Sequence, residues 1–426
     1  MTEPANKRAC EEPTSKMIEY PGEDPAVRRF REFLSVWTVS LTSLESPGPQ
    51  PDYDGAVRFL EREAKDIGLP FKCFELAPNR PVVIISWEGS EPSLPSIMLN
   101  CHTDVVPVYQ DKWECDAFAG YKRENGDIVA RGSQDMKCVG CWYLEAVRNL
   151  RAAGKSFKRS IHMTFVPDEE VGSVHGMKAL VKREDFKQLN VGFCLDEGLA
   201  SPSDVFTVFY AERSGWWFTI HCPGNPGHGS RFIENTAVEK VRKILNKALD
   251  YRDAQEGKLK ADPAMKLGDV TSLNVTMLGG GIQWNVVPDA MSLGLDIRVT
   301  LSDSHQEVME MVEGWVREAG EDCTIDFFTK NVKSPVVCTD DTDPWWSAFS
   351  GACHKHDMKL EKEIFPAATD SRVIRPLGIP ALGFSAINHT PILLHDHNEF
   401  LNERVFLRGI SIYEDLISNL ASVDEQ

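Results

Sequence analysis

Histidine and carboxylate side chains follow several apolar segments of this sequence, where they would be placed to bind metal ions. The apolar segment 96–99 is followed by Asn-Cys-His-Thr-Asp, which brings His102 and Asp104 just beyond a predicted strand. Ligands of open α/β sheets gather at the carboxyl ends of strands. Asp104 could accept the second imidazole N–H of a metal-binding His102 and fix its tautomer. Taken alone, however, the pair favours a structural histidine held by hydrogen bonds.

Acidic residues follow two further predicted strands. One strand leads into Pro-Asp-Glu-Glu-Val-Gly, which contains Glu169 and Glu170, and another leads into Asp-Glu-Gly, which contains Glu197. A solvated loop would also be acidic, but such a loop seldom lies directly between a buried strand and a glycine turn. The acidic segments therefore favour a functional site.

Two more candidates lie far apart in the chain. Asp135 belongs to Arg-Gly-Ser-Gln-Asp-Met-Lys, a glycine turn into a predicted helix, where an ordinary N-cap explains the residue equally well. His395 and His397 belong to Leu-Leu-His-Asp-His-Asn-Glu, which follows a long apolar stretch. Each segment alone is ordinary.

Together these segments place carboxylates at several strand ends, and their mutual repulsion would be costly unless cations held them. Histidines and carboxylates without cysteine suit borderline to hard divalent ions, and two histidines favour zinc. One aspartate shared by two half-sites could bridge two ions about 3.5–4 Å apart. That arrangement needs five ligands, and five candidates are present.

Composition narrows the class of protein. Of the 426 residues, 42% are hydrophobic and 26% charged, as in a globular protein, and the length suits two domains. A net charge of −18 disfavours binding to nucleic acid or an anionic membrane. The sequence contains no run of the roughly 18 to 20 apolar residues that span a bilayer. We therefore expect neither nucleic acid nor membrane as a partner.

The cysteines indicate a reducing compartment. Their number, 11, is odd, they are scattered, and the first residues lack the apolar segment of a secretory signal. We expect free thiols and a cytoplasmic location. Cys138 and Cys141 form Cys-x-x-C, which could be a redox pair or half of a zinc site. They lie within an apolar helical pattern, so buried structural cysteines are favoured.

The order of predicted elements indicates an α/β protein: a helix-covered sheet domain interrupted by an inserted α+β domain. We expect a flexible leader (1–24), a first part of the sheet domain (25–206), an insert (207–332) and a second part of the sheet domain (333–426).

Within the insert, alternation predicts a long strand over 207–221. Strands 272–278 and 283–298 are expected to form a hairpin across the glycines at 279–281. The tryptophan pairs at 216–217 and 345–346 are assigned to packing rather than to a ligand site.

The motifs, read together, resemble the dinuclear zinc exopeptidases, a family that includes aminoacylases and desuccinylases. The resemblance extends from about residue 25 to about residue 418 and is closest to the aminoacylase branch. It is carried by motifs that occur in the family's order: N-C-H-T-D-V-V-P, R-G-S-Q-D-M-K, F-V-P-D-E-E-V-G, L-D-E-G, P-G-H-G-S-R and L-L-H-D-H-N-E.

The resemblance implies particular roles for the candidate ligands. His102, Asp135 and Glu197 would hold one zinc, and Glu170, His395 and the shared Asp135 the other. His395 is chosen over His397 because the family's metal histidine lies four residues before a glutamate. The family often has a cis peptide after the bridging aspartate, here Asp135–Met136.

The resemblance also implies a mechanism. Glu169 would be the general base that activates water for attack on the acyl group of N-acyl-L-amino acids. In an extended strand end, adjacent residues point to opposite sides, which would let Glu170 bind metal while Glu169 faces the water. Asp104 would be a catalytic-site residue behind His102.

The inserted domain would complete the site. His228 would stabilise the tetrahedral intermediate from the partner subunit of a homodimer, although a turn histidine is its plain alternative. Asn285, Arg298 and Arg372 would bind the substrate carboxylate, which arginine can grip through two parallel hydrogen bonds. A dipeptidase or metallocarboxypeptidase of the same family, or a metal-binding relic, remains as an alternative function.

Overall fold

The computed structural model describes residues 19–41 and 49–424. The chain divides into two compact units. The first unit comprises residues up to 210 together with 336–362 and 369–426, and the second comprises 211–335 and 363–368. The return segment 363–368 therefore belongs to the second unit, whereas the sequence pattern placed it in the sheet domain.

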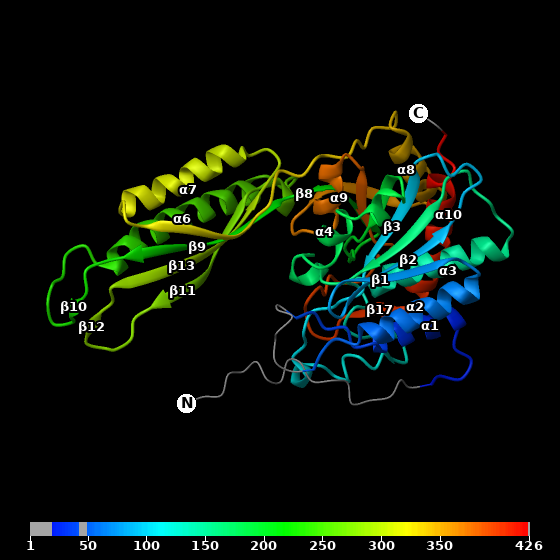
Figure 1. The fold of residues 1–426 in the computed structure, drawn as a ribbon, viewed down its shortest axis with the longest axis horizontal. Helices are drawn as coiled ribbons and strands as arrows, with labels where there is room; N and C mark the ends of the chain where they lie inside the picture. The colour runs from blue at the N-terminus through cyan, green and yellow to red at the C-terminus, as the bar shows by residue number, and fades with distance from the viewer. Residues whose placement is uncertain (1–18, 42–48, 425–426) are drawn as a thin grey trace. The chain divides into compact units, whose positions relative to one another are not determined.

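An eight-stranded sheet forms the centre of the first unit (Figure 1), in the order β1-β2-β6-β3-β7-β16-β8-β15. Its strands are β1 (Phe71–Ala77), β2 (Arg80–Trp87), β3 (Ser96–His102), β6 (Ile161–Val166), β7 (Val191–Asp196), β8 (Val205–Glu212), β15 (Lys359–Phe365) and β16 (Ala381–Phe384). The central strand β3 is parallel to both neighbours, β6 and β7. The α/β class expected from the sequence is confirmed.

Alternate residues of the strands enter two different hydrophobic clusters. In β2, Val83 and Ile85 join the larger cluster, whereas Val82 and Ile84 join the smaller one on the opposite face. Both faces of the sheet are therefore buried, which explains why these strands are continuously apolar in sequence rather than alternating.

Helices cover the sheet. They are α1 (Pro25–Ser35), α2 (Tyr53–Ile67), α3 (Lys137–Ala152), α4 (Met177–Leu180), α5 (Glu184–Lys187), α8 (Pro344–Lys355), α9 (Ser371–Ile374) and α10 (Glu403–Leu420). Gly68 ends α2 in the left-handed conformation, as its sequence position predicts. Helix α3 packs against α10, α1 and β3. A small sheet, β17 (Phe400–Asn402), β5 (Asp127–Val129) and β4 (Tyr121–Lys122), completes this unit.

The second unit is a four-stranded antiparallel sheet with two helices on one face (Figure 1). Its order is β11 (Ser272–Gly280), β13 (Ala290–Val299), β9 (Ser214–Pro223) and β14 (Thr324–Lys330), and its helices are α6 (Ala237–Ala261) and α7 (His305–Ala319). A separate ribbon pairs β10 (Gly227–His228) with β12 (Val286–Val287).

One sequence prediction for this unit is wrong, and another is confirmed with a shifted boundary. The strand expected over 207–221 is two strands, because the chain leaves β8 at Glu212 and begins β9, in another sheet, at Ser214. The expected hairpin is present, because β11 pairs antiparallel with β13, and Gly280 and Gly281 have positive φ as predicted. Its turn lies further along the chain than expected, since Gly279 and Gly280 still pair with Ser292 and Met291 and β13 begins only at Ala290.

The predicted leader is partly ordered. Tyr20 accepts a hydrogen bond from the Lys122 N–H and donates one to the Lys122 carbonyl, both at 2.9 Å. Glu23 forms a 2.7 Å ion pair with the fully buried Arg31. Residues 19–24 are therefore attached to the first unit, and residues 1–18 lie outside the described part of the chain. Among the described residues, no helix is long and apolar enough to cross a membrane.

The contact between α3 and α10 can be tested with two glycine substitutions. A Cβ on Gly409 would lie 2.4 Å from the Trp142 ring, whereas one on Gly351 in α8 would lie 3.8 Å from Asn419. We expect Gly409→Ala to destabilise the protein by about 1–3 kcal/mol through overpacking. Gly351→Ala should stabilise it by roughly 0.5–1 kcal/mol, because alanine favours the helix.

Urea unfolding of both variants beside the unsubstituted protein measures these shifts. Equal stabilisation by the two alanines would show that the Trp142 contact does not constrain α10.

Candidate metal centre and active site

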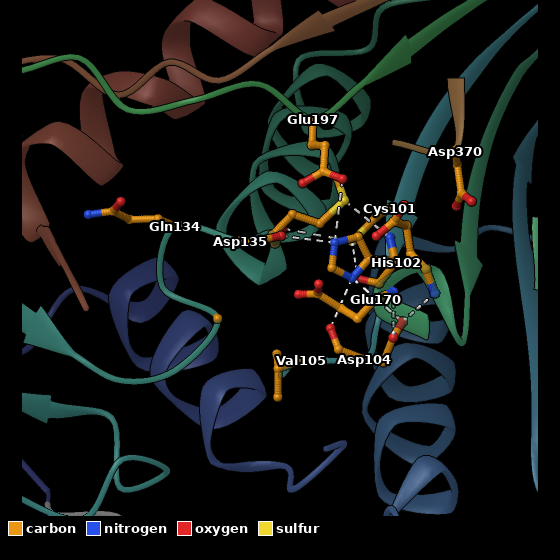
Figure 2. A network of polar contacts seen from close by, with 12 residues as sticks. Cys101, His102, Asp104, Val105, Gln134, Asp135, Glu170, Glu197 and Asp370 are labelled. Atoms are coloured by element: carbon orange, nitrogen blue, oxygen red, sulfur yellow. Dashed lines mark hydrogen bonds and ion pairs between the residues drawn. The ribbon is translucent and has the colours of Figure 1, made fainter. Parts of the chain in front are cut away.

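Three parallel strands carry candidate ligands to one edge of the sheet. His102 is the last residue of β3, the turn with Glu169 and Glu170 follows β6, and Glu197 follows β7. Because β3 lies between β6 and β7 and parallel to both, these side chains are neighbours. Figure 2 shows Asp135, Glu170 and Glu197 directed toward the His102 ring.

The Asp135 carboxylate lies between two histidines. Its Oδ1 is 3.0 Å from His102 Nε2, and its Oδ2 is 3.4 Å from His395 Nε2. Each histidine has a second carboxylate of its own: Glu197 Oε1 is 3.6 Å from His102, and Glu170 Oε2 is 3.1 Å from His395. The structure thus brings together all five candidate ligands, in two groups that share Asp135.

Two sets of three side chains, which overlap these groups without coinciding with them, have metal-ligand spacing. The ligand atoms of His102, Asp135 and Glu170 lie within 4.8 Å of one another, and so do those of His102, Glu169 and Glu197. All are buried or partly buried except His395, whose side chain is 54% exposed. A mixed set of imidazoles and carboxylates at this density fits divalent cations.

The crowded carboxylates perturb one another's protonation. Burial and the Asp135 charge raise the pKa of Glu170 to about 8 and that of Glu197 well above its ordinary value. Hydrogen bonds to Asp135 and Glu170 raise the pKa of His395 to about 10. Protons therefore balance the excess negative charge of the cluster. Divalent cations would do so instead, because metal ligands bind in their deprotonated forms.

Asp104 supports the cluster differently from the sequence expectation. His102 Nδ1 hydrogen-bonds to the backbone carbonyl of Asp104 at 2.9 Å, while the Asp104 carboxylate lies 3.6 Å away. That carboxylate instead accepts hydrogen bonds from the backbone N–H groups of Glu169 and Glu170, both at 3.1 Å. Asp104 therefore fixes the turn that carries these two glutamates.

The geometric argument made from sequence for Glu169 and Glu170 is wrong. They do not continue a strand but lie in a 3₁₀ turn, Glu169–Val171, entered through Asp168 in the left-handed conformation. The buried Arg80 forms a 2.6 Å ion pair with Asp168 and holds this entry. Because the chain turns here, both glutamates reach the cluster.

Asp135 is held by a buried glutamate that sequence reasoning used only as a spacing marker. Glu399, which is 0% exposed, accepts hydrogen bonds from the N–H groups of Gln134 at 2.6 Å and Asp135 at 3.3 Å. Its other oxygen is 2.7 Å from Arg131. The Asp135–Met136 peptide is cis, as expected. His397 packs its ring edge-on against Tyr109, with centroids 6.4 Å apart.

Helix α3 begins immediately after this segment. Its first residue, Lys137, is completely buried and donates hydrogen bonds to the carbonyls of Phe33 and Val36, where α1 ends. Burial lowers the pKa of Lys137 to about 7. Cys138 and Cys141 of this helix are buried free thiols, so they are structural cysteines, as predicted.

Arg372 lies against Glu169. Its guanidinium Nη1 is 2.8 Å from Glu169 Oε1, and its Nη2 donates to Ser173 Oγ at 2.9 Å. Burial raises the pKa of Glu169, and Arg372 opposes this rise. The structure thus places the arginine expected to bind substrate beside the expected base.

A layer of polar residues lies behind the cluster. Asn100 donates to Asp196 at 3.1 Å and to Asp370 at 3.3 Å, and Ser173 donates to Asp370 at 2.5 Å. Burial and the Glu169 charge raise the pKa of Asp370 to about 7. Asp370, Arg80 and Glu399 were missed from the sequence. Their only signal there is a charged residue next to an apolar segment, which many surface residues share.

The remaining candidates belong to the second unit. His228 is exposed on the β10–β12 ribbon, where Gly229 donates a hydrogen bond to the Asn285 carbonyl at 2.8 Å. Arg298 lies near the end of β13, with a 2.7 Å ion pair to Asp296 and its guanidinium over Trp217. The ribbon thus holds His228 near Asn285. Trp216 is buried, and Trp217, which is 37% exposed, stacks on Phe328.

Comparison with known proteins identifies the class. Peptidase family M20/M25/M40 matches residues 98–419. The match covers most of the chain, so this protein belongs to that family and is a hydrolase. The family resemblance expected from the sequence is confirmed.

Several curated relatives are aminoacylases. The chain is 52% identical to Aminoacylase-1 of Mus musculus over 401 residues, 94% of this chain and 96% of the relative. It is 45% identical to Aminoacylase-1 of Dictyostelium discoideum over 414 residues, 94% of this chain and 99% of the relative.

Solved structures share the fold. An M20 family metallo-carboxypeptidase from Sulfolobus solfataricus matches with a TM-score of 0.75 and 17% identity, over 94% of this chain and 100% of the other. A dinuclear metal-binding M20 peptidase from Bacillus subtilis matches with a TM-score of 0.65 and 15% identity, over 94% and 99%.

The role of Glu399 is testable through metal affinity. In Glu399→Gln the amide presents N–H groups where the carboxylate accepts hydrogen bonds, so the segment before Asp135 should loosen. Supporting residues of this kind change metal affinity by about 10–100-fold. We expect a loss of that size in metal titration by calorimetry, with activity recovering at high metal concentration.

Glu91→Gln, on the surface of the same unit, is the control and should bind metal normally. Unchanged affinity in Glu399→Gln would assign Glu399 to folding alone.

Proposed function

We propose that this protein is a dinuclear zinc enzyme that hydrolyses N-acyl-L-amino acids to a carboxylate and a free amino acid. The placement of Asp135 between two histidines, each with its own glutamate, carries the proposal. The 45–52% identity to aminoacylases supports the substrate class. Free thiols at the described cysteines support a cytoplasmic location.

The ligands divide between two ions. His102 and Glu197 would hold one ion and His395 and Glu170 the other, with Asp135 shared. The absence of cysteine from the set and its two imidazoles favour zinc. When bound, such ions lower the pKa of water toward neutrality and polarise a carbonyl oxygen.

Glu169 would act as the general base. It is buried beside His102 and Glu197, and the Asp104 carboxylate fixes its backbone. It takes a proton from the attacking water and returns it to the departing nitrogen of the amide. The Glu169 carboxylate makes this exchange from a buried position.

Arg372 would bind the substrate carboxylate from a position next to the base. A guanidinium has five N–H donors, so Arg372 can hold an anionic group while it remains near Glu169. When substrate binds, its carboxylate would compete with Glu169 for the Arg372 guanidinium and so weaken the contact between Arg372 and Glu169. Substrate binding would thus make Glu169 a better proton acceptor.

We also propose a homodimer in which His228 acts in the partner's site. The ribbon strand β12 ends at Val287, and β13 begins three residues later at Ala290. Arg298 lies eight residues further along β13. At about 3.3 Å per residue this separation is roughly 26 Å, longer than an N-acyl amino acid. If Arg298 and the His228–Asn285 ribbon both contact one substrate, they come from different copies. Two-fold pairing is the commonest way to supply them.

The substrate class can be tested directly. With zinc present, N-acetyl-L-methionine should be hydrolysed with a kcat/KM at least tenfold above that for methionine-containing dipeptides. The dipeptide has a charged amino group where the acyl chain of the proposed substrate is neutral. A preference for dipeptides would instead establish a dipeptidase, and turnover of neither would establish a binding protein.

Substitutions of Glu169 and Glu170 can distinguish the proposed base from the proposed metal ligand in the 3₁₀ turn. Glu169→Gln should keep both metal ions and lose about 10²–10⁴-fold in kcat, because glutamine cannot accept the proton. Glu170→Gln should lose metal first. Metal analysis beside steady-state kinetics distinguishes them, and loss of metal in Glu169→Gln would make Glu169 a ligand.

Subunit mixing tests the homodimer. His228→Asn and Glu169→Gln should each be nearly inactive alone, but mixed dimers would contain one site with an intact Glu169 and an intact partner His228. Activity should return on subunit exchange. If native mass spectrometry shows mixed dimers that stay inactive, His228 acts within its own chain or not at all.

A further inference from the structure

Two cysteines face each other across neighbouring strands of the second unit. In the antiparallel pairing of β14 with β9, Thr324 lies opposite His221. Cys323 precedes Thr324 in the sequence and Cys222 follows His221, so the antiparallel register places the two cysteines opposite each other. Both are free thiols and belong to the same hydrophobic cluster beneath α6 and α7.

The backbone geometry suits a covalent link. Cys323 donates its N–H to the Gly320 carbonyl at 3.1 Å rather than to β9. Opposed residues without mutual backbone bonds have Cα atoms about 4.5 Å apart. Disulfides span about 4.4–6.8 Å between Cα atoms.

We propose that Cys222 and Cys323 are a redox modification site, which hydrogen peroxide converts to a reversible disulfide that fastens β14 to β9. β14 is an edge strand, because it ends the order of its sheet. The link would join the two ends of a segment of roughly 100 residues that contains both helices of the unit.

The surroundings make the two cysteines unequal. Cys222 is 0% exposed, and burial raises the pKa of its thiol to about 12. Cys323 is 8% exposed and lines a groove of about 500 Å³ beside α7, so it is the more accessible of the two residues. Burial raises the pKa of the Cys323 thiol too, but the neighbouring Cys222 and the Lys240 ammonium oppose that rise. Cys323 is therefore the attacking residue.

The reaction balances in two steps. The Cys323 thiolate attacks one oxygen of hydrogen peroxide, the O–O bond breaks, and hydroxide leaves with a sulfenic acid on Cys323. Cys222 then loses its proton and attacks the Cys323 sulfur, forming the S–S bond and releasing water. Overall, two thiols and one peroxide give one disulfide and two waters. A dithiol such as dithiothreitol reverses the change.

Peptide mapping tests the proposal on the intact, unsubstituted chain. The protein is treated with hydrogen peroxide, its remaining thiols are blocked with N-ethylmaleimide under denaturing conditions, and it is digested without reductant. We expect a peptide that links Cys222 to Cys323, lost on treatment with dithiothreitol, and a matching loss of two free thiols. The oxidised protein should also melt at a higher temperature.

Single substitutions provide the controls. Cys323→Ser and Cys222→Ser should both lose the linked peptide, while Cys73→Ser, which removes an exposed thiol in the first unit, should retain it. Oxidation of Cys73 and Cys338, or of Cys323 to a sulfinic acid, without a link to Cys222 would overturn the proposal. Mapping of the unsubstituted protein decides the question even if a serine variant fails to fold.

Discussion

The rest of the structure depends on one carboxylate shared by two histidines. Asp135 approaches His102 with one oxygen and His395 with the other. Further carboxylates surround this pair, so the site concentrates negative charge that only cations or protons can balance. A buried group of this kind is costly to assemble, and the surrounding fold has to hold each member in place. The shared aspartate thus makes the two half-sites one unit.

The scaffold meets this demand with buried polar groups aimed at backbone atoms. The Glu399 carboxylate accepts a hydrogen bond from the backbone N–H of Gln134, just before Asp135. The Asp104 carboxylate accepts hydrogen bonds from the backbone N–H groups of the two glutamates after β6. Arg80 fixes the entry to that same turn through Asp168. The candidate ligand side chains therefore owe their positions to neighbours outside the cluster, and removing one such neighbour would leave a buried charge unpaired.

Much of this could be predicted from the sequence, because periodic apolar segments and the acidic or histidine residues after them are local signals. The strands β2, β3, β6 and β7 were found in this way. The local signals also indicated the five clustered side chains as candidates, but the family resemblance was needed to choose His395 over His397 and to assign Asp135 as a ligand. Residues that support the cluster from distant parts of the sequence could not be found from such local signals. Glu399 lies 264 residues from the amide of Asp135, and only the fold brings them together. The break between β8 and β9 was missed because alternation continues through both strands, although they belong to different sheets.

Metal stoichiometry in Asp135→Ala tests the central claim most directly. Elemental analysis of the purified variant, beside Glu197→Gln as a control that removes a ligand from one half-site, measures how many ions each retains. Because Asp135 contributes to both half-sites, its variant should lose both ions, whereas Glu197→Gln should keep one. An Asp135→Ala protein that retains one tightly bound ion and hydrolyses substrate would contradict the shared-carboxylate account.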